Sequence, residues 1–529
     1  MAVTTAFLLP NNGGYAMREL AQANKSLVLT RKSVSCSKGI LTQNLSVTLP
    51  VLSTLNEKDC KPFWNQQCSD IQSTLWLPQK TDSQDLVSSL SNGLLNYQVD
   101  ESRSWMTRIT PLNHSTPQNL SVLLPRSAIA TTESDLLKGA KVIASKKIRF
   151  YPENESAYFD ALALYRRSYN LAVERFRNDD YKDENGKFIN MRPAIKAQVE
   201  QEQKESGRAY NSLVSDNGTL AAATTFKSVC SKNKKLKGAK SGFSEISFKS
   251  RKGSKHSFSI DRLPKGLNPC VKALGKIHLT ESVPSEAIGK SCIITCDKGR
   301  WFIQVQQHIE LQTEIQGEVK CVGVDQGVRT FATCFSKDDA LVVGDNFSKE
   351  KLFPLMKRVD KLIGQKQKVL NTQKGVKFTD MPQWARDRII YFDREINRLK
   401  CKKDDLILDL HNRLAHELVS NYDVIFLPSF ETRRMVTRKD KKIRTIRRNT
   451  CRQMLDLNHY GFKLRLKWYA KKYGKQVVDC NESHTSKTRS WDGIIDKKLG
   501  SSKIIKGDGF TVDRDINGAR NILLKHLTR

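Results

Sequence analysis

The pattern of apolar and polar positions changes near residue 140. Before that point the chain is rich in Ser, Thr, Asn and Leu, and apolar pieces such as Leu45 to Leu52 show no sustained period. Segments of this kind bury too little apolar surface to fix one conformation. We therefore predict that residues 1–140 form a poorly ordered or loosely packed N-terminal extension.

Regular patterns begin at residue 141. Residues 146–152 have the pattern of a strand that Pro152 ends, and residues 155–177 carry apolar side chains at helical spacing. The charged stretch that follows is also expected to be helical, which predicts a helical lobe over 158–225.

Residues 241–310 contain short apolar pieces broken by Gly and Lys, such as Cys292 to Cys296 and Trp301 to Val305. Short strands separated by turn residues are typical of small all-β units. Together with the strand near residue 146, they predict a small β-barrel built from 141–157 and 226–317.

The remaining residues, 318–529, have the pattern of a mixed α/β domain. Strands are predicted over 318–324, 330–335, 422–428 and 476–480. Amphipathic helices precede the third strand and fill about 451–473, and a short helix starts at Ile516. This order of strands and helices is that of an RNase H-like fold.

Acidic residues follow the predicted strands. Asp325 ends the first strand, Glu482 follows the last, and Asp513 and Asp515 precede the terminal helix. A lone Asp before Gln-Gly is more often a turn residue, so the prediction of a site depends on the whole set. Carboxylates at such strand ends can bind two divalent ions for phosphodiester hydrolysis, and an oxygen-only site favours Mg²⁺ or Mn²⁺.

The charge of the chain indicates a polyanionic partner. The formal net charge is +34, and residues 1–140 hold 12 Lys and Arg against 10 Asp and Glu, so +32 lies in the remaining 389 residues. Nucleic acid is the expected partner. Residues 433–448 hold nine Lys or Arg, including Arg433, Arg434, Arg447 and Arg448. We expect this run to contact phosphates, with a solvated charge run as the alternative.

Composition also bears on the compartment. No stretch of about 18 apolar residues occurs, so no membrane-spanning helix is expected. The 12 cysteines lack paired C-x-x-C spacing and fit a reducing setting. Basic clusters at 232–237 and 438–444 suit nuclear import. We expect a nuclear protein. The first 40 residues, with Glu19 as their only acid, leave organelle targeting as a minor alternative.

Four motifs carry a family resemblance. The segment Gly323-Val-Asp-Gln-Gly-Val-Arg-Thr-Phe-Ala-Thr resembles the first RuvC motif of TnpB nucleases, and Asp513-Arg-Asp-Ile-Asn-Gly-Ala-Arg-Asn-Ile resembles the third. With Leu427-Pro-Ser-Phe-Glu and Glu482-Ser-His-Thr-Ser-Lys-Thr, the chain resembles Fanzor, the eukaryotic TnpB-like family of RNA-guided DNA endonucleases. The resemblance is good over about 318–529 and weaker over 141–310.

The resemblance implies a RuvC-like nuclease domain over 318–529, preceded by a β-barrel wedge domain with a helical recognition insertion. The protein would act as a monomeric ribonucleoprotein in which a noncoding guide RNA pairs with double-stranded target DNA beside a short adjacent motif. Asp325 and Asp515 map onto catalytic, metal-binding positions, with Asp513 as an alternative. The residues expected to contact nucleic acid, besides the four arginines above, are Lys146, Lys147, Arg149, Tyr169 and Asn170.

Two departures from the family pattern matter for the site. Many relatives carry the middle catalytic glutamate where Glu431 stands, whereas a subset places it before Thr-Ser-Lys-Thr, and we favour Glu482 in that rearranged position over Glu431. The zinc-binding cysteine pairs of many relatives are absent from 485–510, so we predict a degenerate zinc-finger-like insertion without zinc. Its packing is expected from Trp491, Ile494, Ile495 and Leu499, with stacking of Trp491 on a base as the alternative.

Two other functions stay open. The chain could be a transposon-derived nucleic-acid-binding protein that no longer cuts, which the acidic set disfavours. It could also be a guide-independent RNase H-like nuclease, which the basic region over 141–310 disfavours because such an enzyme needs no bound RNA.

Overall fold

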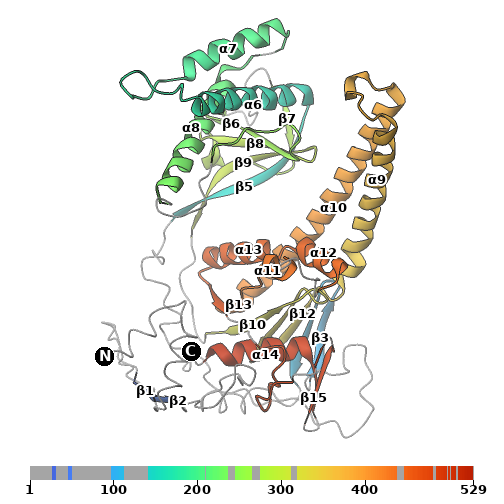
Figure 1. Cartoon of the computed structure of the whole chain (residues 1–529). Helices are drawn as coiled ribbons and strands as arrows, with labels where there is room; N and C mark the ends of the chain where they lie inside the picture. The colour runs from blue at the N-terminus through green and yellow to red at the C-terminus, as the bar shows by residue number, and fades with distance from the viewer. Residues whose placement is uncertain are drawn as a thin grey trace. The chain divides into compact units, whose positions relative to one another are not determined.

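The computed structural model describes part of the chain and divides it into two compact units (Figure 1). The described residues are 27–30, 46–49, 97–111, 141–208, 210–235, 245–264, 274–310, 319–437, 446–480, 484–496, 499–500, 502–507 and 510–527. Unit 1 takes in Met1–Lys138, Gln312–Asp360 and Lys403–Arg529, and unit 2 takes in Gly139–Leu311 and Lys361–Lys402. Both units combine helices with sheets, so the fold is mixed α/β.

A seven-stranded sheet forms the centre of unit 1, in the order β14-β13-β10-β11-β12-β4-β3. Its strands are β3 (Tyr97–Arg103), β4 (Met106–Pro111), β10 (Cys321–Gln326), β11 (Ala332–Ser336), β12 (Ala340–Val343), β13 (Val424–Pro428) and β14 (Gln476–Cys480). Strands β10, β13 and β14 run parallel, whereas β10, β11, β12, β4 and β3 pair antiparallel in turn. The four strands predicted between residues 318 and 480 are confirmed.

Helices cover both faces of this sheet. Helix α14 (Arg514–Leu527) shares one core cluster with Val424 and Phe426 of β13. The other cluster joins Ile425 and Leu427 of β13 to α10 (Gln383–Asn421), α12 (Arg448–Leu457) and α13 (His459–Lys472). Because successive side chains of a strand point to opposite faces, a strand covered on both sides must be apolar throughout, as β13 is.

The helix predicted over about 451–473 is two helices. Asn458 adopts a left-handed conformation with φ of 50°, and its side chain accepts a hydrogen bond from the Gly461 amide, so it caps the start of α13. An Asn tolerates this conformation better than most residues, which explains the break.

A hairpin from the N-terminal extension completes the sheet. Strand β4 pairs with β12, and Met106 and Ile109 are each 1% exposed. Arg108 contacts both Asp339 and Glu417 through its guanidinium group. Residues 97–111 therefore do not fit the loosely packed extension that we predicted over 1–140. Two further short strands of that region, β1 (Leu27–Thr30) and β2 (Ser46–Leu49), pair with each other, and the rest lies outside the described residues.

Unit 2 contains an open sheet rather than the closed barrel that we predicted. Its five strands are ordered β6-β8-β9-β5-β7. Their bounds are β5 (Lys141–Pro152), β6 (Lys255–Ile260), β7 (Ile277–Leu279), β8 (Cys292–Asp297) and β9 (Arg300–Glu310), with a 3₁₀ turn η2 at Ser285–Ala287. In the described part of the chain β6 and β7 are edges that do not pair with each other.

Helices bury one face of that sheet, so the sheet does not have to close on itself to cover its apolar side chains. They are α6 (Glu155–Arg177), α7 (Arg192–Glu205) and α8 (Ser212–Lys235). Tyr158 of α6, Phe258 of β6 and Trp301 of β9 belong to one core cluster with an edge-to-face contact of 5.4 Å between Tyr158 and Trp301. The predicted helical lobe therefore shares its core with the sheet, and α8 extends into residues expected to belong to the barrel.

A long helical hairpin lies between β12 and β13 in the chain. It begins with a π-helical turn, η3 (Ser348–Leu352), continues as α9 (Phe353–Thr372), turns through η4 (Phe378–Asp380) and returns as α10. Figure 1 shows α9 and α10 side by side. None of the helices in the described residues is long and apolar enough to cross a bilayer.

Candidate active site

Asp325 lies near the C-terminal end of β10, an interior strand of the unit 1 sheet. It pairs in register with Thr333 of β11 and is half-buried. Because β13 and β14 run parallel to β10, their C-terminal ends lie at the same edge of the sheet. Any side chain that follows these strands is therefore brought toward Asp325.

Helix α14 contacts Asp325 through a residue without a side chain. A methyl group built on Gly518 would overlap the Asp325 carboxylate and would lie 3.5 Å from Ser486 Oγ. One turn earlier on the helix is Asp515, and residues three apart occupy the same helix face. Asp515 therefore lies on the helix face that carries Gly518, which contacts Asp325, and the shared site of the two aspartates stays a prediction.

Asp513 has a different environment. It is 6% exposed, and its Oδ1 accepts hydrogen bonds from the backbone amides of Asp515 (2.8 Å) and Ile516 (3.3 Å). Burial, followed by the charge of Asp515, raises the pKa of Asp513 to about 6. Asp513 therefore caps the start of α14, which is a sufficient structural reason for a carboxylate at this position.

The loop Thr485-Ser-Lys-Thr488 is held against α14 by side chains of the helix. Asn521 Nδ2 donates to the carbonyl oxygens of Thr485 (2.8 Å) and Thr488 (2.7 Å). Asn517 Nδ2 also donates to the Thr488 carbonyl oxygen, and its Oδ1 accepts from the Ser490 amide at 2.8 Å. These contacts fix Ser486, which lies between the tied carbonyls, beside Asp325.

Arg520 completes this attachment from a fully buried position. Its Nη1 donates to the Ser490 carbonyl oxygen, and burial lowers the pKa of its guanidinium to about 9. Sequence reasoning named neither Asn517, Arg520 nor Asn521 as functional. The available signal was an arginine and two asparagines among the apolar residues 516–524 of α14, because such side chains need partners when buried.

Of the two candidates for the third carboxylate, the described residues include only Glu431. Glu482 lies outside the described residues, two positions after Cys480, the last residue of β14. Glu431 is exposed and follows β13, whose last residue, Pro428, is the register partner of Cys480. Both candidates therefore follow neighbouring strand ends. Among the described residues no group of three or more His, Cys, Asp or Glu has the geometry of a metal site.

A cluster of stacked aromatic rings connects the segments that follow β10 and β13. Phe331 stacks on His459 (5.0 Å between centroids) and on His411 (5.2 Å), and Phe430 lies 4.5 Å from His459. Burial lowers the pKa of His411 to about 4 and that of His459 to about 3. Two neutral histidines thus pack between the segment after Asp325 and the residue before Glu431.

The predicted zinc-free segment has its own packing. Arg489 forms an ion pair with Asp492 (3.2 Å), and its guanidinium packs on Gly507, where a methyl group would overlap it. Strands β15 (Ile504–Gly507) and β16 (Phe510–Asp513) form a hairpin that leads into α14. Trp491 packs against the α14 core and Leu499 is buried, but Ile494 is 44% exposed and does not contribute as expected.

The predicted nucleic-acid contacts fall into several groups. Lys147 and Arg149 lie on the exposed face of β5, and Lys147 Nζ is 3.8 Å from the Phe302 ring centroid. Lys146 has the opposite orientation and pairs with Glu281 at 3.2 Å. Arg447 and Arg448 are exposed at the start of α12. Arg433 and Arg434 belong to α11 (Thr432–Val436), and their side chains lie outside the described residues.

Tyr169 and Asn170 have structural contacts instead. Tyr169 is 4% exposed and lies under the Lys249 ammonium, 4.4 Å from its ring centroid. Asn170 exchanges two hydrogen bonds with the Lys249 backbone, at 3.1 and 2.8 Å. These residues fasten the segment before β6 to α6, so the expected base or phosphate contact has no support from their geometry.

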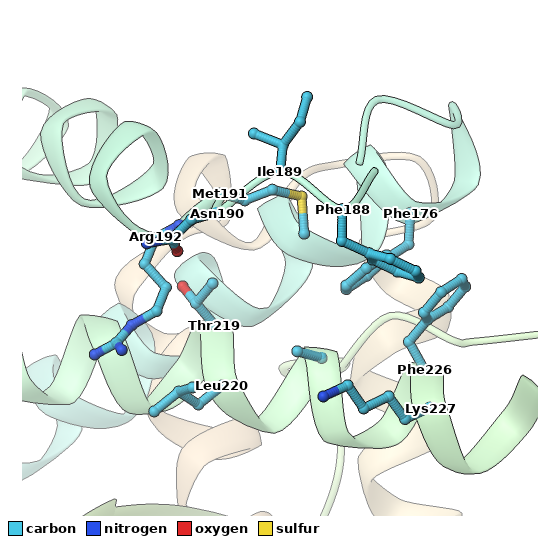
Figure 2. Close-up of a pocket in the computed structure, with 11 residues that line it drawn as sticks. Phe176, Phe188, Ile189, Asn190, Met191, Arg192, Thr219, Leu220, Phe226 and Lys227 are labelled. Atoms are coloured by element: carbon cyan, nitrogen blue, oxygen red, sulfur yellow. Dashed lines mark hydrogen bonds between the residues drawn. The ribbon is translucent and has the colours of Figure 1, made fainter. Parts of the chain in front are cut away.

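Unit 2 also contains an apolar groove of about 190 Å³ between α6, α8 and residues 188–192 (Figure 2). Figure 2 shows Phe176, Phe188 and Phe226 gathered at one end and Arg192 toward the other. The rings of Phe176 and Phe226 stack at 4.2 Å. No carboxylate, thiol or imidazole lines the groove, so it offers no chemistry for hydrolysis.

The region of the candidate site and much of the chain are similar to known proteins. Residues 459–522, which hold α13, β14, the 485–488 loop and most of α14, match the family model described as Cas12f1-like, TNB domain. A TnpB-like protein of Acanthamoeba polyphaga mimivirus is 25% identical over 402 residues, covering 72% of this chain and 73% of the relative. A putative transposase of Paramecium bursaria Chlorella virus 1 is 26% identical over 467 residues, covering 80% and 96%.

Two further similarities are more limited. A protein named putative RNA-guided DNA endonuclease InsQ, from Escherichia coli, is 24% identical and covers 47% of this chain and 60% of its own length. A solved Cas12f1 in complex with sgRNA and target DNA aligns with a TM-score of 0.37 at 12% identity, covering 72% of this chain and 98% of that one. The chain is thus similar to viral TnpB-like proteins over most of its length, and to the Cas12f1-like family model over residues 459–522.

Proposed function

We propose that this TnpB-like and Cas12f1-like chain is an RNA-guided DNA endonuclease that hydrolyses phosphodiester bonds at one RuvC-like site. The order of β14, β13, β10, β11 and β12, with the first three parallel, supports an RNase H-like nuclease domain. The observation that carries the proposal is the contact of Asp325 with Gly518, because it joins strand β10 to the helix that contains Asp515.

The donor set suits hard divalent cations. Only carboxylate oxygens would come from Asp325, Asp515 and Glu482, with Glu431 as the alternative third residue. The absence of a side chain at Gly518 leaves room for the Asp325 carboxylate. We infer Mg²⁺ or Mn²⁺ as the cofactor. When bound, the ions would activate a water molecule and stabilise charge on the departing 3′ oxygen.

The surrounding residues fix these carboxylates in place. Asp513 holds the first turn of α14 through two backbone amides, which orients Asp515. Asn517 and Asn521 keep the 485–488 loop on the helix, so Ser486 stays beside Asp325. Preorganised ligands avoid a reorganisation cost when substrate arrives.

The exposed face of the unit 2 sheet suits the guide RNA. Lys147, Arg149 and Tyr151 alternate along β5 on its exposed side, with Phe302 of β9 opposite Arg149. Arg149 lies over the Tyr151 ring at 4.9 Å. Cations beside accessible aromatic rings are suited to phosphates and unpaired bases. The DNA partner would be a duplex with a short adjacent motif, bound by a monomeric ribonucleoprotein.

Within the TnpB-like proteins, the motifs of residues 318–529 favour Fanzor, and with it action in the nucleus. Fluorescence of a tagged protein in eukaryotic cells would test this placement. Accumulation in an organelle would contradict it.

The deciding experiment is to purify the protein with its RNA, sequence that RNA, and add matched DNA with and without Mg²⁺. We expect a discrete RNA and matched cutting that Asp325→Ala and Glu482→Ala abolish. Glu431→Ala, run beside them, should cut like the unaltered protein. Absence of a specific RNA, or cutting that survives Asp325→Ala, would contradict the proposal.

A further inference from the structure

The first half of α10 has one face that is already packed and one that is open. Ala385 and Ile389 are buried against Val369 and Leu370 of α9. Lys366 of α9 pairs with Asp393 of α10 at 2.5 Å. The hairpin is therefore held together by a face of α10 that lies about 100–140° around the helix from Trp384.

That open face carries aromatic and basic side chains in alternation. Trp384 is 54% exposed and Tyr391 is 53% exposed, and Arg388 between them is exposed as well. At about 100° per residue, Arg398 and Lys402 fall within about 40° of the Trp384 direction. We name Trp384, Arg388, Tyr391, Arg398 and Lys402 the α10 stripe; at about 1.5 Å per residue it is about 27 Å long.

The charge around the α10 stripe is positive and largely uncompensated. Residues 353–402 contain 13 Lys and Arg against 5 Asp and Glu, a net of +8. The nearby acids already have partners: Asp393 pairs with Lys366, Glu395 with Arg398, and Asp387 accepts from Gln383. Within the described residues, Arg388 and Lys402 form no ion pair or hydrogen bond.

We propose that the α10 stripe binds an unpaired segment of the RNA that the protein carries. This inference depends on the proposed function for the identity of that RNA. A second copy of the chain is a poor occupant, because two such stripes would oppose like charges. A duplex is also poor, because its stacked bases leave nothing for the two rings.

Unpaired nucleotides satisfy both features, since bases stack on exposed rings while Arg and Lys contact the phosphates between them. Trp384 and Tyr391 are about 10.5 Å apart along the helix axis, so each ring can take a separate base. A structured RNA offers loops and bulges that stay unpaired, whereas target DNA is unpaired only after it has been opened. The RNA is therefore the occupant that we assign.

The test irradiates the purified protein with its RNA, before and after addition of target DNA, and identifies cross-linked peptides by mass spectrometry. We expect ribonucleotide adducts on Trp384 or Tyr391 in both states. Adducts that contain only deoxyribonucleotides, or none on this helix, would overturn the inference.

Affinity measurements give a second readout. A fluorescent oligouridylate of about 12 nucleotides should bind the Trp384→Ala, Tyr391→Ala double variant at least about tenfold more weakly. Its salt dependence should be unchanged, whereas Arg388→Ala should reduce the slope by about 0.7. Leu408→Ala is the control, because Leu408 is 41% exposed on the same helix but about 120° from the stripe. Equal weakening by Leu408→Ala would contradict the inference.

The two hypotheses fail separately. If the protein binds RNA through the stripe but cuts no matched DNA, the proposed function is wrong and the binding surface remains. If the protein cuts matched DNA but α10 gives no ribonucleotide adducts and the stripe substitutions leave RNA affinity unchanged, the surface is wrong and the function remains.

Discussion

At position 518, the residue that would best stabilise the helix would also disturb the candidate site. Alanine favours a helix over glycine by up to about 1 kcal/mol, yet a methyl group here would overlap the Asp325 carboxylate. We expect Gly518→Ala to lower the cutting rate at least about tenfold while the protein stays folded, since displaced catalytic groups cost this much or more.

Gly364→Ala is the matched control for that substitution. Gly364 lies in α9, and nothing is within 4 Å of the added methyl group. This variant should raise the unfolding free energy by roughly 0.5–1 kcal/mol and leave cutting unchanged. Equal loss of cutting in the two variants would remove Gly518 from the site.

Substitutions of the three aspartates should lower the cutting rate to different extents, because the three carboxylates have different roles. Asp325→Ala and Asp515→Ala should each lower the rate of matched DNA cutting by about 10³-fold or more, because each removes a carboxylate from the reacting centre. Asp513→Asn retains an oxygen that caps α14 and should cut within about tenfold of the unaltered protein. Single-turnover cleavage checks all three, and a loss in Asp513→Asn equal to the others would make Asp513 a catalytic residue.

His459 gives the stability of unit 1 a dependence on pH. Its folded pKa is lowered to about 3, chiefly by burial. A lowered pKa means that the unfolded chain binds the proton more readily, so stability is lost as the pH falls from about 6.5. His459→Phe removes this contribution, and its urea midpoint should fall less between pH 7 and pH 5.

The exposed His416 on α10 supplies the control for this measurement. His416→Gln should follow the unaltered protein over the same pH range. A His459→Phe variant with an unaltered pH dependence would show that the buried imidazole is not responsible.

At the scale of elements, the β3–β4 hairpin is part of the unit 1 sheet, because β4 pairs with β12. Arg108 joins β4 to Asp339 and to Glu417 of α10. Arg108→Ala leaves two carboxylates facing each other, so the unfolding free energy should drop by about 1–3 kcal/mol. Arg413→Ala, which removes an exposed pair with Asp409, should change it by less than about 1 kcal/mol. Denaturant unfolding distinguishes the two.

Elements with a strong apolar pattern could be predicted from the sequence. Strand β14 has the predicted bounds, and β13 is apolar because both of its faces are covered. The β3–β4 hairpin was missed because its polar residues pair with partners more than 200 positions away, as the separation of 231 between Arg108 and Asp339 shows. No local pattern reports such a contact.

The candidate site was predictable in part for the same reason. Asp325 and Asp515 stand at an element end or start that the pattern identifies, so both could be named as candidates from the order of strands and helices. The attachment of the 485–488 loop did not, because it depends on which face Asn517 and Asn521 present to it. The structural contacts of Tyr169 and Asn170 could not be predicted from the sequence, because aromatic and amide side chains suit a core as well as a ligand.

At the scale of the whole molecule, charge should control binding strength. If six to ten phosphates are contacted, at a slope of about 0.7 per phosphate for a single strand, RNA affinity should fall roughly 300-fold to 10⁴-fold between about 50 and 200 mM salt. A titration with the same labelled oligouridylate measures the slope. A slope near zero would contradict a phosphate-dominated interface despite the net charge of +34.

The place of unit 2 in the chain sets an order for synthesis on the ribosome. Strand β4 ends at Pro111, and β10, the next strand of its sheet along the chain, starts only at Cys321. At roughly 5–20 residues per second, about 10 to 40 s separate the two. The sheet strands of unit 2 end at Glu310. The core of that sheet can therefore form before β12, the partner strand of β4, has been synthesised. The nascent hairpin is then an unpaired edge exposed to chaperones or to neighbouring chains.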